Sequence, residues 1–182
     1  MESPGKIYLE SLIKRFLTYK ELGDKTFAQL EDNDFHFTPG PESNSIAAIV
    51  QHISGNMLSR WTNFLTEDGE KEWRNRDQEF EETAETKAEI VARWEKGWKC
   101  LLDTLKSLTE ADLLKTIYIR NEPLIVIDAI NRQFAHYPYH VGQIIYVGKM
   151  IRKENWNSLS IPKGKSEEYN KMIDAGIAER KK

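Results

Sequence analysis

Residues 125–145, IVIDAINRQFAHYPYHVGQII, contain the clearest helical pattern in the chain, because apolar side chains recur there every three or four residues. This spacing gathers them on one face of an α-helix, whereas a half-buried strand would alternate apolar and polar residues. A helix is therefore predicted from near Ile125 to near Asn155, and Pro138 is expected to kink or locally widen it. The predicted buried face consists of Ile127, Ile130, Phe134, Tyr137, Val141, Ile144 and Ile145.

Three more long helices are predicted from the same periodicity. The first covers residues from about 4 to 32, and the second is capped by Ser45 and carries apolar residues from Ile46 to Phe64. The third carries apolar residues from Ala84 to Leu105. Four long helices indicate an all-α protein in the form of a four-helix bundle, which we expect to be a single domain of residues 1–182.

The segments between and after these helices differ in composition. Residues from Thr66 to Glu82 are dense in charge and nearly without aliphatic side chains, so we expect an exposed crossover. The β-rich residues 116–119 precede a turn signal at residues 120–123, which predicts a small hairpin or an ordered loop. After the fourth helix, Ser166 is expected to cap a short amphipathic tail helix.

The composition indicates a cytoplasmic globular protein. The 182 residues include 26 basic and 29 acidic side chains, a net charge of -3, whereas nucleic-acid binders normally carry a basic face. No apolar run approaches the roughly 20 residues that span a bilayer, and the N-terminus lacks the core of a signal peptide. The single cysteine, Cys100, cannot form an intramolecular disulfide and fits a reducing compartment. We therefore expect no nucleic-acid partner and no membrane association.

Three of the four histidines lie in the predicted helices and are candidate metal ligands. His136 and His140 are four residues apart, so their side chains share one helix face. His52 lies in the second helix, in IAAIVQHISGN, and could supply a third nitrogen atom, whereas His36 is expected to be a loop residue. Three imidazoles on a divalent ion leave coordination positions open, which is typical of catalytic sites. Spacing alone leaves open the alternative that these are ordinary core or surface histidines.

Polar residues near these histidines are weaker candidates for catalytic or orienting groups. Gln133 precedes and Gln143 follows the histidine pair of the fourth helix by three residues, and Asn56 lies four residues after His52. Their amides could bind the histidine rings or a substrate. No carboxylate stands at helical spacing beside the histidines, so the sequence identifies no general base. A metal- or small-ligand-binding module without turnover therefore stands as the alternative to an enzyme.

A histidine in the second of four helices, followed far downstream by the pattern HxxxHxGQI at residues 136–144, resembles the DinB-like (damage-inducible) superfamily. The WNSLSIPKGKS ending at residues 156–166 is similar to that of an uncharacterised bacterial subgroup, and the resemblance covers nearly the whole chain. It implies an up-down-down-up four-helix bundle that binds a divalent metal ion, nickel or zinc, through His52, His136 and His140.

Characterised members of this superfamily include bacillithiol S-transferases and a mycothiol-dependent maleylpyruvate isomerase. The resemblance therefore implies a metal-dependent thiol transferase, with a low-molecular-weight thiol among its small-molecule substrates. In such an enzyme the metal would lower the pKa of the thiol and hold the thiolate as the nucleophile. The resemblance also implies a homodimer, but it does not identify the reaction, because one fold supports many chemistries.

Overall fold

The computed structural model describes residues 2–81 and 83–176, and this part of the chain is mainly helical. Within it, the long helices α1, α2, α3 and α4 span Pro4–Phe27, Ile46–Trp61, Lys87–Ser107 and Val126–Arg152. A shorter helix, α5, spans Ser166–Asp174, and the strands β1 and β2 cover Thr116–Ile119 and Glu122–Ile125. Short 3-10 helices, η1 to η4, lie at Asp32–His36, Asp77–Phe80, Glu110–Asp112 and Lys153–Asn155. The prediction of a helical protein is confirmed, with a small two-stranded sheet added to it.

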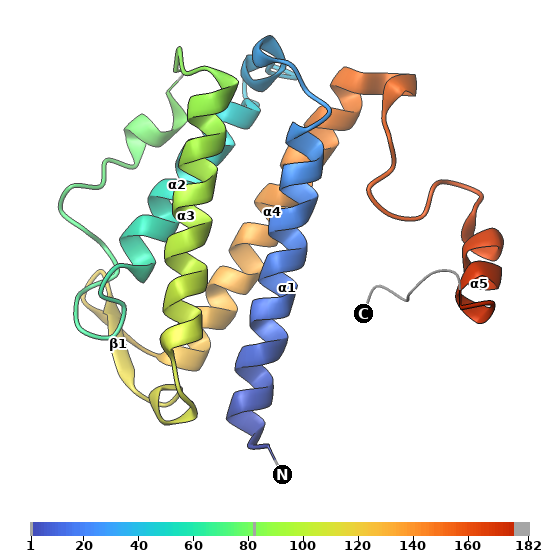
Figure 1. Cartoon of the computed structure of the whole chain (residues 1–182). Coiled ribbons are helices and arrows are strands. Elements are labelled where there is room, and N and C mark those ends of the chain that lie inside the picture. Colours follow the sequence, from blue (N-terminus) through green and yellow to red (C-terminus); the bar gives the residue numbers. More distant parts are fainter. Residues whose placement is uncertain (1, 82, 177–182) are drawn as a thin grey trace.

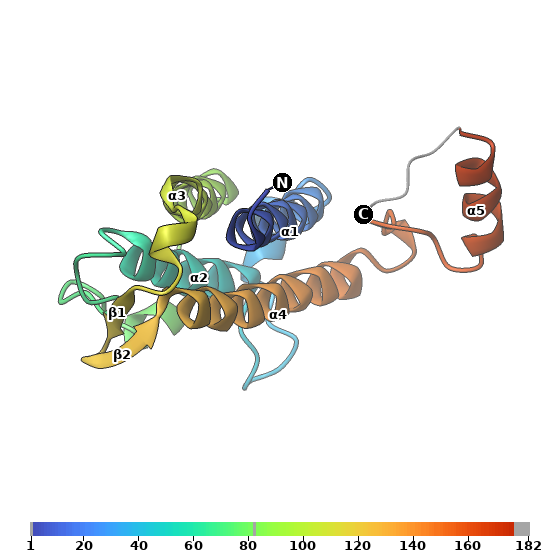
Figure 2. The ribbon, with the colours of Figure 1, turned by 90° about the horizontal axis from the view of Figure 1, so that it is seen from below.

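The long helices pack in two layers. Figure 1 shows α1 and α4 running in one direction and α2 and α3 running in the other. In Figure 2, α1 and α3 lie in one layer, and α2 and α4 lie in the other. The most extensive helix packing joins α2 to α3 and α1 to α4, so both of these pairs hold the layers together. Helix α5 lies apart from the long helices in both views.

Aromatic rings fill the space between the layers. Phe16 of α1, Trp98 of α3 and Tyr137 of α4 are fully buried, and their ring centroids lie 6.1 to 6.2 Å apart. Trp94 packs beside Trp98, and its ring passes so close to α1 that a Cβ on Gly23 would lie 2.4 Å from it. Aromatic contacts of this kind add to the stabilisation from burial and restrict how the three helices approach one another.

The helix ends agree only in part with the sequence predictions. The cap Ser45 is confirmed, since its hydroxyl accepts a hydrogen bond from the Ala48 amide. The predicted end of the first helix near residue 32 is wrong, because α1 ends at Phe27 and the chain turns there to bury Leu30. The predicted cap of the tail helix is also wrong: Ser166 is the first residue of α5, and the residue at the cap position, Lys165, makes no capping hydrogen bond with its side chain.

The residues after α3 form the hairpin, one of the two alternatives that the sequence left open. Strands β1 and β2 pair antiparallel, and the turn residues Arg120 and Asn121 adopt left-handed φ angles of 57° and 62°. Two positive φ angles match the twist of paired strands. The Asp68 carboxylate accepts a hydrogen bond of 2.8 Å from each turn amide, so the hairpin is attached to the crossover between α2 and α3.

The expectation that this crossover is exposed is wrong for its central part. Arg74 and Glu79 are buried, with side chains only 1% and 7% exposed. Charged side chains can be buried where a counter-charge and hydrogen bonds replace water. Arg74 and Glu79 meet this condition by pairing with each other, and the pair lies against α2 rather than in solvent.

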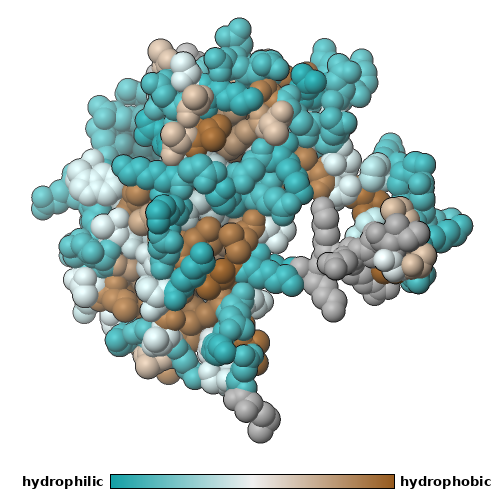
Figure 3. Space-filling view, viewed as in Figure 1, coloured by the Kyte–Doolittle hydropathy of each residue, from teal (hydrophilic) through white to brown (hydrophobic). Residues whose placement is uncertain are grey.

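The face of the molecule that carries α1 and α3 is mainly hydrophilic, as Figure 3 shows, with hydrophobic residues exposed between the two helices. Exposed apolar residues on α1 include Ile7 and Leu17. The other apolar residues of the long helices face mostly inward, as expected of amphipathic helices. Across the described residues, no helix combines the length and the hydropathy that a membrane span requires.

Candidate metal centre

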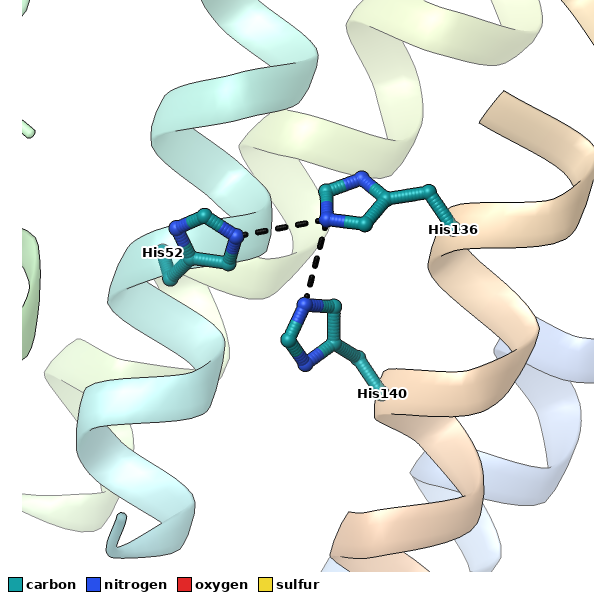
Figure 4. Close-up of side chains that lie close together, drawn as sticks. All are labelled: His52, His136 and His140. Carbon is teal, nitrogen blue, oxygen red and sulfur yellow. Dashed lines mark hydrogen bonds between the residues drawn. The ribbon is translucent and has the colours of Figure 1, made fainter. Parts of the chain in front are cut away.

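Three histidines from two helices face one another between α2 and α4 (Figure 4). His52 projects from the middle of α2, and His136 and His140 project from successive turns of α4, which continues as one helix through Pro138. Nε2 of His136 lies 3.3 Å from Nε2 of His52 and 3.2 Å from Nε2 of His140. The fold therefore brings together the three residues that the sequence singled out, with ligand atoms within 4.8 Å of one another.

Two of the three separations between these nitrogen atoms match those expected around one ion. Tetrahedral zinc with Zn–N bonds of about 2.0–2.1 Å places two nitrogen ligands roughly 3.3–3.4 Å apart. The Nε2 atom of His136 lies close to this spacing from its two neighbours, at 3.3 Å from His52 and 3.2 Å from His140. The same distances would suit a hydrogen bond only if a proton lay between the nitrogen atoms. The protonation of the rings therefore decides between a bound cation and a shared proton.

The outward nitrogen atom of each ring, Nδ1, contacts an oxygen acceptor from outside the cluster. The contacts run from His52 to Oε2 of Glu79 at 2.9 Å, from His140 to Oε1 of Gln143 at 2.8 Å and from His136 to Oε1 of Gln133 at 3.4 Å. Because the partners are acceptors, each Nδ1 carries the hydrogen, and in a neutral ring Nε2 then keeps its lone pair. Lone pairs that converge in this way favour a cation between them.

Burial keeps two of these rings neutral. Burial, followed by the charges of His140 and His52, lowers the pKa of His136 to about 3. Burial also lowers the pKa of His140 to about 4, although its hydrogen bond with Gln143 acts in the opposite direction. Both rings are therefore uncharged at neutral pH, the form that binds metal ions. With their Nδ1 hydrogens directed outward, no proton is left between these two Nε2 atoms.

Glu79 connects the cluster to the buried ion pair of the crossover. Its carboxylate oxygens accept hydrogen bonds from Nε and Nη2 of Arg74 at 2.7 and 2.8 Å, in addition to the contact with His52. Burial alone would raise the pKa of Glu79, but the hydrogen bonds from Arg74 and His52 outweigh it and lower this pKa. The carboxylate is therefore charged at neutral pH and holds the His52 ring in one orientation.

A glycine in α2 makes this contact possible. Gly55 lies three residues after His52, on the helix against which Glu79 packs. A Cβ at residue 55 would lie 2.4 Å from Oε1 of Glu79, closer than real Cβ contacts. A residue with a Cβ would therefore force the Glu79 carboxylate to shift, so glycine at position 55 lets Glu79 lie this close to α2.

Aromatic rings flank the histidine cluster. Phe80 stacks on His52, with ring centroids 4.7 Å apart and planes at 28°. Tyr139 packs against His140 with centroids 4.0 Å apart, and about half of its side chain is exposed. Apolar groups around a metal site limit the access of water and lower the local dielectric. The cluster is thus partly enclosed on both its α2 and its α4 sides.

The predicted orienting residues have different partners. Gln133 and Gln143 contact the histidine rings, as described above, whereas Asn56 does not. The Asn56 side-chain oxygen accepts a hydrogen bond from the buried Tyr137 hydroxyl at 2.9 Å, and that hydroxyl accepts one from Nε1 of Trp61 at 3.0 Å. Asn56 therefore belongs to a network that joins α2 to α4. A catalytic role for any of these amides stays a prediction.

Sequence periodicity did not reveal Arg74, Glu79 or Phe80. They lie in the crossover, where dense charge and the lack of helical spacing indicated solvent exposure. One signal was available, since Gly55 inside a helical pattern can mark a close approach by another segment. The fourth histidine, His36, lies outside the cluster and contacts the Glu85 carbonyl oxygen through Nε2 at 2.9 Å.

Comparisons with known proteins identify the family of the chain. No curated protein matches the chain. The model of a family described as "Protein of unknown function (DUF1572)" matches residues 3–165, which include the three histidines and their Nδ1 partners. The match ends directly before α5, which begins at Ser166. Because the match covers most of the 182 residues of the chain, the chain belongs to the DUF1572 family.

Proposed function

We propose that this chain is a divalent-metal-dependent enzyme whose metal centre consists of His52, His136 and His140. One observation carries the proposal: the Nε2 atoms converge, while each Nδ1 contacts an acceptor outside the cluster. Ligands held by outer partners in this way are oriented for an ion before it binds. The resemblance to the DinB-like superfamily supports the same assignment, together with an up-down-down-up four-helix bundle as the scaffold.

The reaction that we propose is the transfer of a low-molecular-weight thiol to a small electrophile. The thiol loses its proton to solvent, its sulfur forms a bond to the electrophilic carbon, and the electrophile releases a leaving group or takes up a proton. A nickel or zinc ion on three imidazoles would keep coordination positions open and lower the pKa of a bound thiol or water. The chain itself supplies the neutral ligands, their fixed orientations and the rings of Phe80 and Tyr139 that limit water. The thiol is preferred to water because the superfamily that the chain resembles includes thiol-dependent transferases.

A binding module without turnover is the second candidate, and one contact favours it. The carboxylate that reaches the cluster, Glu79, is already bound to Arg74 and His52. It is therefore not free to accept a proton from a substrate, as a general base must. A reaction that depends on such a base would fail at this centre, whereas binding alone would not.

Metal analysis of the purified protein tests the centre. We expect stoichiometric zinc or nickel in the wild type and its loss in His52→Ala and His136→Ala. His36→Ala is the matched control, because His36 lies outside the cluster and should keep the metal content of the wild type. Stoichiometric metal in both cluster variants would overturn the three-histidine centre.

A conjugation assay separates the enzyme from the binding module. Metal-loaded and metal-free wild type are compared with His136→Ala across a panel of low-molecular-weight thiols and electrophiles. We expect conjugation above the uncatalysed rate only with the loaded wild type. Rates equal to the blank for all thiols, in protein that holds its metal, would favour the binding module. The homodimer that the resemblance implies is a separate proposal, which analytical ultracentrifugation tests.

A further inference from the structure

A pocket of about 500 Å³ borders the histidine cluster. It lies between residues 39–44, which precede α2, and the exposed side of α4; Figure 2 shows that segment, in light blue, projecting from the layer of α2 and α4. Two pocket residues also contact the cluster, since Tyr139 packs on the His140 ring and Gln143 contacts its Nδ1. A molecule in this pocket would therefore be separated from a metal ligand by a single side chain.

The pocket is lined by a glycine that packing does not require. A Cβ on Gly142 would meet no atom of the described residues within 4 Å. On the same helix, a Cβ on Gly148 would lie 2.8 Å from Cγ2 of Thr26. Glycine is less favourable than alanine inside a helix, so close packing explains Gly148 but not Gly142. The space above Gly142 is instead open to a ligand.

The other residues of the pocket suit an organic cation. Tyr139 and Tyr146 are seven residues apart on α4, and the two residues are 52% and 66% exposed, so two aromatic rings flank the space above Gly142. Glu42 is the charged residue among those that line the pocket, and it forms no ion pair with other described residues. Aromatic faces attract ammonium groups, and a carboxylate attracts them further. An anionic ligand would instead be repelled by Glu42.

We propose that this pocket binds the ammonium group of an amine-bearing substrate of the metal centre. The inference rests on the proposed function, since the metal centre is what makes the bound molecule a substrate. The ammonium group lies between the tyrosine rings and the Glu42 carboxylate, and the reacting end extends past Tyr139 toward the histidines. Asn44 and Gln143 line the same pocket and offer hydrogen bonds to polar groups between the two ends.

Titration with benzyltrimethylammonium tests the pocket, and benzenesulfonate serves as an anion of similar size that coordinates metals weakly. We expect the cation to bind roughly tenfold or more tightly than the anion, with and without added zinc. Tyr146→Ala should weaken cation binding roughly two- to fivefold, whereas Tyr118→Ala, a similarly exposed tyrosine on β1, should not change it. Glu42→Gln should weaken it as well, and Gly142→Leu should abolish it by filling the space.

Equal affinity for the cation and the anion would overturn the ammonium pocket, and so would unchanged cation binding in both Glu42→Gln and Gly142→Leu. Should circular dichroism indicate that Gly142→Leu does not fold, Glu42→Gln and Tyr146→Ala decide, because both positions are exposed. The metal content of the same samples separates the two proposals. Wild type that binds zinc or nickel but not the cation refutes only the pocket, whereas wild type that binds the cation but neither zinc nor nickel refutes the metal centre.

Discussion

Removal of the Glu79 carboxylate should weaken metal binding, and two substitutions should do so to different extents. Oε2 of Glu79 accepts hydrogen bonds from both His52 and Arg74, whereas Oε1 accepts one from Arg74 alone. In Glu79→Gln, the amide oxygen can replace Oε2, so His52 keeps an acceptor but loses the neighbouring negative charge. In Glu79→Ala, His52 loses the acceptor as well, and its ring is free to rotate.

Loss of the outer partner of a metal-bound histidine typically weakens metal binding about 10–100-fold. We expect Glu79→Gln to weaken metal binding about 10-fold and Glu79→Ala about 100-fold, which correspond to losses of about 1.4 and 2.7 kcal/mol in binding free energy. Both substitutions also leave the Arg74 side chain, only 1% exposed, without its counter-charge. Breaking a buried pair in this way typically lowers stability by about 3–5 kcal/mol.

Zinc affinity would be measured by competition with a chromophoric chelator at neutral pH, and stability by urea unfolding of the metal-free protein. Glu70→Ala is the matched control. The Glu70 carboxylate also lies in the crossover and pairs with the buried Arg60, with Arg76 and with Arg120, so within the described residues its ion-pair partners are arginines and not a histidine. This control should lower stability without changing zinc affinity. Wild-type zinc affinity in Glu79→Ala would refute the role of Glu79 in holding His52. An equal loss of zinc affinity in Glu70→Ala would mean that a general destabilisation of the fold causes the effect.

Three further outcomes follow from the same structure. The metal-free protein should lose stability as the pH falls from about 6.5 toward 4, because the unfolded chain binds protons on His136 and His140, which the folded state keeps neutral. Urea unfolding across this range should show that the free energy of unfolding depends less on pH in the double variant His136→Gln/His140→Gln. An equal pH dependence in the variant and the wild type would contradict this prediction. Tyr137→Phe should lower the free energy of unfolding by about 1–3 kcal/mol, because the buried Trp61 donor and the buried Asn56 acceptor both lose the Tyr137 hydroxyl as their partner. An unchanged free energy of unfolding in denaturant would argue against a stabilising role for these two hydrogen bonds. Gly55→Ala should weaken zinc binding, because its Cβ would displace Glu79. Gly142→Ala should leave zinc binding unchanged and raise the free energy of unfolding by up to about 1 kcal/mol, because its Cβ meets open space in a helix. Equal zinc affinities in the two variants would exclude the proposed role of Gly55.

The long helices could be predicted because their information is local. Apolar residues such as Phe134, Tyr137 and Val141 recur with the helical period, and the helices that they predict occur in the structure. The errors lie at the ends, where tertiary packing competes with the pattern. Leu30 continues the period of the first helix, yet it is buried in a turn after Phe27.

The crossover shows why composition misled the prediction of exposure. A dense run of charges normally faces water, because burying a single charge is unfavourable. Arg74 and Glu79 compensate each other and are buried as a pair. Arg74 lies in a loop and Glu79, five residues later, lies in the short helix η2, so their spacing carries no periodic signal and the pairing becomes visible only in the folded chain.

The candidate metal centre divides in the same way. The proximity of His136 and His140 follows from the sequence alone, because residues four apart share a helix face whatever the rest of the chain does. The position of His52 beside them depends on how α2 packs against α4, and the contact of Glu79 depends on a glycine 24 residues earlier in the chain. These distant contacts arise from the packing of α2 beside α4 within one layer and from one buried ion pair, which no local spacing encodes.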